Sequence, residues 1–182
     1  MEKGKIIFLS GVSSSGKSTL AKSLQEKLAE PYSWLSIDNF LGTIHDKFHN
    51  SEYRMSLRQT LKAMHRTIAL FSDMGLNVIV DHVLHKQEWL DDCVNVLNEY
   101  PVLFVHVTCP LEELRRREKE RGDRPVGRAE EQLSQLSPKD TYDITVDTSK
   151  EKCIDEIIEI LNYPEKFTAF KILNTKEKKH GH

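Results

Sequence analysis

The sequence predicts an α/β fold in which a parallel β-sheet is covered by helices on both faces. Short apolar runs, rich in β-branched and aromatic residues, alternate along the chain with helical patterns. The runs contain few polar residues, as expected for strands that are buried on both faces. Because crossovers between parallel strands are right-handed, the carboxyl ends of the strands and the loops after them lie along one edge of the sheet.

The elements follow in order along the chain. The expected strands are residues 5–10, 33–38, 77–81, 102–109 and 143–148. The expected helices are residues 18–30, 52–74, 87–100 and 151–162, together with a charged helix that begins after Pro110. The first helix should end before Pro31, because proline disfavours helical geometry in the residue before it. Gly75 should end the second.

The chain has 182 residues, which is enough for one domain with a buried core. We expect this domain over residues 1–164, followed by a basic C-terminal tail, 165–182, that is solvated or loosely docked. A formal charge of −2 argues against a general nucleic-acid surface, and no apolar stretch is long enough to span a bilayer. The three cysteines form no CxxC pair, which is typical of reduced thiols in a cytoplasmic protein.

Residues 11–20, GVSSSGKSTL, have the pattern of a phosphate-binding loop. Gly11, Gly16, Lys17 and Ser18 match GxxxxGK[ST] between a predicted strand and a predicted helix. The glycines let backbone N–H groups turn toward phosphate oxygens, and the helix presents its positive end to them. Lys17 supplies a charge for the β- and γ-phosphates, and the Ser18 hydroxyl can ligate Mg²⁺.

The pattern therefore predicts a bound nucleoside triphosphate with Mg²⁺. The chain has no NKxD-like guanine reader and no DxxG switch, which favours ATP over GTP. The residues expected to contact the nucleotide in this loop are Gly11, Val12, Ser13, Ser14, Ser15, Gly16, Lys17, Ser18 and Thr19.

Two aspartates follow predicted strands at the phosphate edge. Asp38 closes residues 33–38, where a carboxylate can accept the proton of an acceptor hydroxyl or orient that hydroxyl; the alternative is a cap on the following turn. Asp81 closes residues 77–81, where it can hold Mg²⁺ directly or through water; it could instead bind the acceptor or cap the strand end.

Residues of about 112–135 have the composition of a small helical lid. A glycine and a proline interrupt the charged helix, and Arg121 and Arg124 flank the interruption. Arginines there can fork onto phosphate oxygens or stack on adenine as the lid closes, and Arg117 lies one turn before Arg121. The alternative is a solvated helix whose charges pair with one another.

Two histidine pairs have spacings that could suit a metal ion, His45 with His49 and His82 with His85. No HExxH motif accompanies them, so we interpret these histidines as substrate-pocket or surface residues.

With these motifs the chain resembles the chloramphenicol phosphotransferase-like family of P-loop small-molecule kinases. The matching stretches span about residues 5–160 in order and are GVSSSGKST, SID, VIVDHV, ERGDRPVGRAEEQ and YDITVDTSKEKCIDEI. The resemblance implies a P-loop kinase-like three-layer fold with a five-stranded parallel sheet, ATP over the loop, Asp38 as base and an arginine-bearing lid. It also implies that residues 146–151, including Asp147, Thr148 and Ser149, lie beside the adenine.

One position departs from the resemblance. His82 follows Asp81 where a second carboxylate is expected, and an imidazole cannot replace that carboxylate as an anion. Residues 40–53, including Phe40 and His45, should shape the acceptor pocket together with Asp81 and His82. The resemblance therefore supports kinase chemistry more firmly than it supports chloramphenicol, or antibiotic resistance, in particular.

The sequence thus predicts an ATP- and Mg²⁺-dependent kinase for an alcohol on a small molecule. Lys17, Arg121 and Arg124 would stabilise charge on the phosphoryl group, and Asp38 would position the acceptor hydroxyl. Two alternatives stay open: a nucleoside or nucleoside-monophosphate kinase, and a regulatory module that binds ATP without acceptor chemistry. Asp38 counts against the module, because a switch needs no base that faces an acceptor. The sequence does not indicate an oligomeric state.

Overall fold

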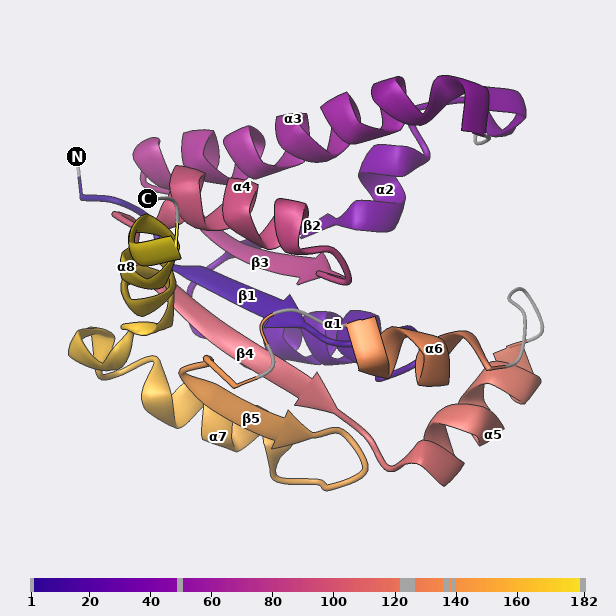
Figure 1. Cartoon of the computed structure of the whole chain (residues 1–182). Coiled ribbons are helices and arrows are strands. Elements are labelled where there is room, and N and C mark those ends of the chain that lie inside the picture. Colours follow the sequence, from indigo (N-terminus) through magenta and orange to yellow (C-terminus); the bar gives the residue numbers. More distant parts are fainter. Residues whose placement is uncertain (1, 49–50, 122–126, 136–137, 139, 181–182) are drawn as a thin grey trace.

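A central parallel sheet organises the chain (Figure 1). The computed structural model describes residues 2–48, 51–121, 127–135, 138 and 140–180. Within these residues the sheet has five strands in the order β2-β3-β1-β4-β5, and every neighbouring pair is parallel. The strands are β1 (Ile6–Ser10), β2 (Tyr32–Ser36), β3 (Asn77–His82), β4 (Val102–Thr108) and β5 (Ile144–Asp147). The predicted α/β fold is confirmed.

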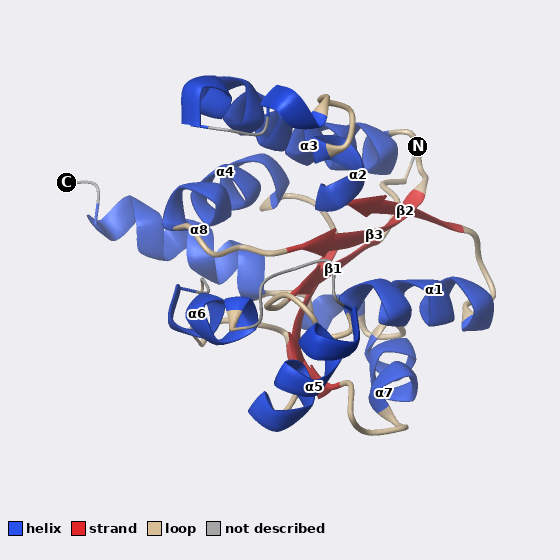
Figure 2. Cartoon of the chain, turned by 90° about the vertical axis from the view of Figure 1, so that its right-hand side faces the viewer, coloured by secondary structure: helices blue, strands red, loops and turns tan. Residues whose placement is uncertain are grey.

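Helices cover both faces of this sheet, as the two views together show (Figures 1 and 2). One face carries α1 (Lys17–Lys27) and α7 (Cys153–Ile160), and the other carries α3 (Arg54–Asp73), α4 (Gln87–Leu97) and α8 (Ala169–His180). The short α2 (Ile37–Leu41) follows β2, while α5 (Leu111–Arg121) and α6 (Arg128–Gln135) follow β4. Among the described helices, none is both long and apolar enough to cross a membrane.

The first strand shows why the sheet is buried on both sides. Successive side chains of a strand point to opposite faces, so Ile6 and Phe8 enter the core under α3, α4 and α8, while Ile7 and Leu9 enter the core under α1 and α7. None of these four side chains is exposed to solvent. A strand that is buried on both faces, such as β1, therefore requires an unbroken run of apolar residues.

The carboxyl ends of the strands meet at one edge, as predicted. The strand register places Ser10 opposite His82 and Ser36 opposite Asp81, and on the other side Thr108 lies opposite Asp147. In Figure 1 the strand arrows point toward α5 and α6, and both chain termini lie toward the opposite end of the sheet. The loops that follow β1, β2, β3 and β5 therefore share one side of the molecule.

The second strand ends earlier than the sequence predicts. β2 stops at Ser36, and Asp38 lies in the first turn of α2 instead of closing the strand. Ser36 begins this helix as its N-cap, because its Oγ accepts a hydrogen bond of 3.1 Å from the N–H of Asn39. Asp38 consequently leaves the sheet on a helical turn. α1 is also shorter than predicted and ends at Lys27, because Leu28 is already extended.

The C-terminal segment differs most from its prediction. Residues 165–182 were expected to be solvated or loosely docked, but Ala169, Phe170 and Leu173 of α8 are buried in the core. The ring of Phe170 lies 4.9 Å from that of Phe104 and 5.6 Å from that of Phe8, measured between centroids. Apolar residues three or four positions apart on one helix face cover β4 and α4 here, so the prediction of a loose tail is wrong for this segment.

We expect the substitution Phe170→Ala to lower the free energy of unfolding by about 3–5 kcal/mol, because it leaves a cavity between two core rings. Urea denaturation followed by circular dichroism measures this change. Lys171→Ala is the matched control, since the Lys171 side chain is exposed. Equal denaturation midpoints for the two variants would show that α8 is not part of the cooperative core.

Candidate active site

A cavity of about 550 Å³ opens at the carboxyl edge of the sheet. It brings together the loop after β1, the start of α2, the end of β3 and the segment after β5, which are far apart in the sequence. Residues of the phosphate-binding pattern that line it are Ser13, Ser14, Gly16, Lys17, Ser18 and Thr19. Both predicted acids, Asp38 and Asp81, line the same cavity.

The loop after β1 has a backbone that only certain residues permit. Gly16 has a φ of 93°, and a Cβ atom there would lie 3.0 Å from Thr148 Oγ1. A Cβ at Gly11 would lie 2.3 Å from the carbonyl oxygen of Val107. Ser14 itself adopts a positive φ of 60°. The two glycines of the pattern are therefore required by geometry, and the strained loop is held in place by the strand and helix around it.

Charged and hydroxyl groups converge at the start of α1. Lys17 is 6% exposed, and its Nζ donates to the carbonyl oxygen of Val12 at 2.9 Å and lies 3.9 Å from Asp81 Oδ1. Ser18 Oγ donates to Asp81 Oδ2 at 2.6 Å. The structure thus joins the hydroxyl and the carboxylate that the sequence predicts as magnesium ligands, although they are 63 positions apart.

Thr148 connects the end of the sheet to the loop. Its Oγ1 donates to the carbonyl oxygen of Ser15 at 2.6 Å and accepts from Nη1 of Arg117 at 2.9 Å. Glu113 accepts from Nε of the same arginine at 2.8 Å. Thr148 and Arg117 therefore stand at the wall of the cavity beside Gly16, and their contact with a nucleotide stays a prediction.

Asp147 and Ser149, the two neighbours of Thr148, are hydrogen-bonded to each other. Asp147 Oδ1 accepts hydrogen bonds from both the backbone N–H and the Oγ of Ser149, and these bonds hold the pKa of Asp147 below its usual value. Neither residue lines the cavity, whereas Lys150 and Glu151 do. The Asp147–Ser149 turn shapes the segment beside the cavity, and its contact with a nucleotide stays a prediction.

Only some of the residues predicted to contact the acceptor line the cavity. Asp38 is exposed at the cavity, where Ile37 and Val83 are its apolar neighbours. Phe40 packs against the core, and His45 is exposed with its Nδ1 3.3 Å from the N–H of Lys47; neither lines the cavity. Residues 49–50 of the predicted acceptor region, with His49, lie outside the described residues.

His82 also lies away from the cavity, and its placement corrects the assignment as a substrate contact. The side chain is fully buried on the opposite face of the sheet from Asp81, among the aromatic rings of Phe8 and Trp89. Consecutive strand residues point to opposite faces, so Asp81 and His82 cannot serve the same pocket.

In the described residues, the segment predicted to form a lid contains the two helices α5 and α6. Gln132 of α6 is buried against the phosphate-binding loop, and its Oε1 accepts from the N–H of Ser13 at 2.7 Å. Glu118, only 2% exposed, accepts from the N–H groups of Gly127 and Ala129 and so joins the two helices. The sequence reasoning missed Gln132 and Glu118, because no motif marks them within a charged segment.

The lid arginines are described only in part. Arg121 is the last residue of α5, and Arg124 falls within residues 122–126, outside the described part of the chain. Their predicted roles on the phosphoryl group stay predictions. Arg116, in contrast, pairs with Glu113 and Glu120 at the surface, which is the solvated arrangement expected of much of this helix.

Comparisons with known proteins show the family to which the chain belongs. The family model described as chloramphenicol phosphotransferase-like protein matches residues 4–163. A candidate O-phosphotransferase of Mycobacterium tuberculosis is 30% identical over 173 residues, which cover 82% of this chain and 77% of that protein. Adenylyl-sulfate kinase of Clostridium acetobutylicum is 28% identical over 173 residues, with coverages of 88% and 84%.

Solved structures share the fold. APS kinase CysC of Mycobacterium tuberculosis, in complex with AMPPNP and APS, has a TM-score of 0.70 at 21% identity and covers 89% of this chain and 99% of its own. Shikimate kinase of Acinetobacter baumannii, in complex with shikimate, has a TM-score of 0.63 at 18% identity, with coverages of 88% and 92%. At these identities the likeness shows the fold alone, and it confirms the predicted P-loop kinase-like fold.

Proposed function

This chain belongs to the chloramphenicol phosphotransferase-like family and is a phosphotransferase of the P-loop kinase type, and we propose that it transfers the γ-phosphoryl group of ATP to an alcohol hydroxyl of a small molecule. The observation that carries the proposal is the convergence of Lys17, Asp38 and the Ser18–Asp81 pair on one cavity. These groups correspond to the separate requirements of phosphoryl transfer: a cation for the phosphates, a base for the acceptor, and oxygen ligands for a divalent ion.

The residues present fit ATP with Mg²⁺. The Ser14 Oγ is buried at the cavity with no hydrogen-bond partner in the described residues, and the N-terminus of α1 points its N–H groups to the same place. Ser18 and Asp81 would hold Mg²⁺, since this cation prefers hydroxyl and carboxylate oxygens. When bound, the ion neutralises charge between the β- and γ-phosphates.

In this proposal Asp38 is the general base for the acceptor hydroxyl. Asp38 takes the proton of the acceptor hydroxyl, the acceptor oxygen forms a bond to the γ-phosphorus, and the bond from that phosphorus to the β–γ bridging oxygen breaks. ADP leaves with the electron pair of the broken bond. Lys17 stabilises the developing charge, and Arg121 and Arg124 complete this stabilisation from the lid.

The acceptor is proposed to be a hydroxylated molecule with an apolar part. Ile37 and Val83 line the cavity together with Asp38 and Asp81, so a carbon skeleton can pack beside the reacting hydroxyl. Chloramphenicol is the first candidate because the family carries its name. A nucleoside or nucleoside monophosphate is the competing acceptor, since the same fold serves several kinase reactions.

One experiment tests the proposal. The purified protein is incubated with ATP and Mg²⁺ against chloramphenicol, other hydroxylated antibiotics, sugars, nucleosides and nucleoside monophosphates, and mass spectrometry detects any phosphorylated product. A phosphorylated alcohol that is not a nucleotide supports the proposal and names the acceptor. A phosphorylated nucleoside or monophosphate replaces it with nucleotide chemistry. ATP binding without any product contradicts an acceptor of the classes tested.

We expect Ser18→Ala to raise the Mg²⁺ concentration that gives the half-maximal rate by about tenfold or more, because one of the two oxygen ligands is removed. A magnesium titration at saturating ATP measures this shift. Ser23→Ala is the control, since Ser23 lines the same cavity but lies outside the loop pattern. An unchanged magnesium requirement in the Ser18 variant would remove this hydroxyl from the proposed metal site.

A further inference from the structure

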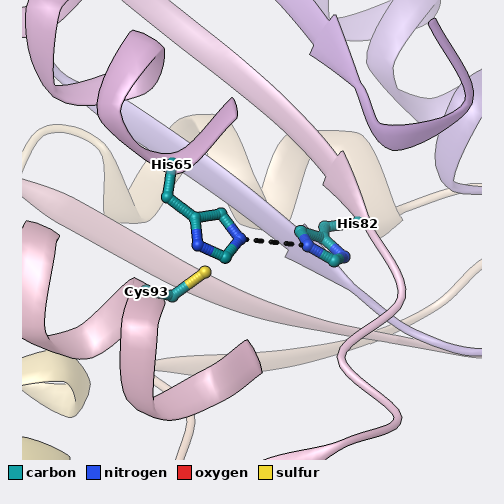
Figure 3. Close-up of side chains that lie close together, drawn as sticks. All are labelled: His65, His82 and Cys93. Atoms are coloured by element: carbon teal, nitrogen blue, oxygen red, sulfur yellow. Dashed lines mark hydrogen bonds between the residues drawn. The ribbon is translucent and has the colours of Figure 1, made fainter. Parts of the chain in front are cut away.

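Three metal-binding side chains meet in the core on the far side of the sheet from the ATP cavity. His65 comes from α3, His82 is the last residue of β3, and Cys93 comes from α4. All three are buried, and their ligand atoms lie within 4.8 Å of one another. Figure 3 shows the Cys93 sulfur directed toward the two imidazole rings, which face each other through their Nε2 atoms.

The two histidine nitrogens of this cluster are spaced like ligands around one ion. In a tetrahedral zinc site the Zn–N distance is about 2.0–2.1 Å, so two ligating nitrogens lie about 3.3 Å from each other. The Nε2 atoms of His65 and His82 are 3.2 Å apart. A hydrogen bond alone could explain why the two imidazoles lie this close together. The Cys93 thiol is therefore the stronger indication of a metal site, because it adds a soft sulfur ligand near the two nitrogens.

A carboxylate orients the first histidine. Asp92 Oδ2 lies 2.6 Å from Nδ1 of His65, so the ring carries its proton on Nδ1 and presents the lone pair of Nε2 to His82. Nη1 of Arg66 donates a hydrogen bond of 3.3 Å to the same carboxylate oxygen. Burial alone would raise the pKa of Asp92, but the hydrogen bonds from His65 and Arg66 lower it below its usual value. A carboxylate–histidine pair of this kind commonly supports a metal ligand.

The second histidine donates to the first. Because His65 presents a lone pair, Nε2 of His82 carries the proton of the hydrogen bond between them. An ion that takes the place of this hydrogen bond requires that proton to move to Nδ1 of His82, which leaves Nε2 as the ligand atom.

A cavity at the surface reaches one member of the cluster, His65. A cavity of about 270 Å³ lies between α3 and α4, and its lining includes His65, Asp92 and Trp89. The cavity is separate from the ATP cavity, since none of its lining residues is shared. Of the three proposed ligands His65 alone lines this cavity, so an ion that enters between α3 and α4 meets His65 first and does not pass through the nucleotide site.

We propose that His65, His82 and Cys93 bind one transition-metal ion, with Zn²⁺ favoured by the two-nitrogen, one-sulfur ligand set. On binding, the Cys93 thiol releases its proton to solvent and the thiolate forms the metal–sulfur bond. The ion links α3, α4 and the end of β3. Because Asp81 precedes His82 on that strand, the link fixes the strand end that supplies the acid of the ATP cavity.

Cobalt tests the site directly, because Co²⁺ takes zinc sites and a thiolate–cobalt bond gives a near-ultraviolet charge-transfer band. The full chain is stripped with a chelator and titrated with Co²⁺. The expected result is one ion per chain with this band, and loss of the band when Zn²⁺ is added. Absence of stoichiometric binding overturns the proposal. Cobalt bound without the band places the ion elsewhere, for example at Ser18 and Asp81, and also overturns it.

Variants of two of the three residues, Cys93 and His65, test the assignment of the band. Cys93→Ala and His65→Gln should each abolish it, while Cys109→Ala, which removes a cysteine outside the cluster, should keep it. A band that persists in Cys93→Ala overturns the assignment. If either variant fails to fold, wild-type protein decides: Zn²⁺ should raise the melting temperature of the stripped protein, and no change would count against the site. This test is independent of the proposed kinase reaction, because it measures metal rather than product.

Discussion

Asp38→Asn is expected to lower kcat by ~10²–10⁴ and to leave ATP affinity nearly unchanged. The amide keeps the size and hydrogen-bonding shape of the carboxylate but cannot accept the proton of the acceptor hydroxyl. Asp38 is exposed at the cavity on the first turn of α2, and asparagine has nearly the same volume as aspartate, so the fold should tolerate the substitution. The effect should therefore fall on turnover.

The measurement is a steady-state assay with the acceptor that the panel identifies, together with calorimetric titration of ATP. Asn39→Ala is the matched control, since Asn39 is exposed on the same short helix. Unchanged turnover in Asp38→Asn would remove this residue from the mechanism. A large loss of ATP affinity would place Asp38 at the nucleotide instead of the acceptor.

Lys17→Ala is expected to lower kcat/KM by about 10²–10³ or more, because one preorganised cation on the transferring group is lost. The wild-type protein should bind ATP much more tightly than adenosine, and the variant should lose most of that difference. The substitution also removes the cation 3.9 Å from the buried Asp81 carboxylate, so a modest loss of stability should accompany the loss of activity.

Calorimetry with ATP and adenosine on both proteins separates these effects. Lys22→Ala is the control on the same helix, because Lys22 is exposed and its Nζ lies over the ring of Trp34 instead of at the cavity. Equal affinities for ATP and adenosine in the wild-type protein would contradict phosphate recognition by the loop. Circular dichroism confirms that a weakened variant is still folded.

The sequence by itself determined the five strands, the helices α1, α3, α4, α5 and α7, the loop after β1 and the meeting of Asp38 and Asp81 at the same cavity. These features depend on local patterns. Apolar periodicity identifies each element within a short window, and the glycines and lysine of the loop have fixed spacing. The rule that parallel strands end at one edge then places Asp81 near Ser18 without knowledge of any side-chain contact.

Local patterns failed where a residue's role depends on what packs against it. The end of β2 was placed at Asp38 because Ser36 can end a strand or cap a helix, and only its hydrogen bond to Asn39 decides between them. The basic composition of residues 165–182 indicated a solvated tail, yet Phe170 packs against both Phe8 and Phe104, and this burial outweighs the charges on the other side of α8.

Only the tertiary structure decided the contacts between distant segments. The binding of Thr148 to Ser15 joins residues 133 positions apart, and Gln132 reaches Ser13 across 119 positions. The cluster of His65, His82 and Cys93 likewise arises because α3 and α4 pack side by side over the end of β3. No spacing rule links such residues, because the distance between their side chains is set by helix packing and not by the chain that joins them.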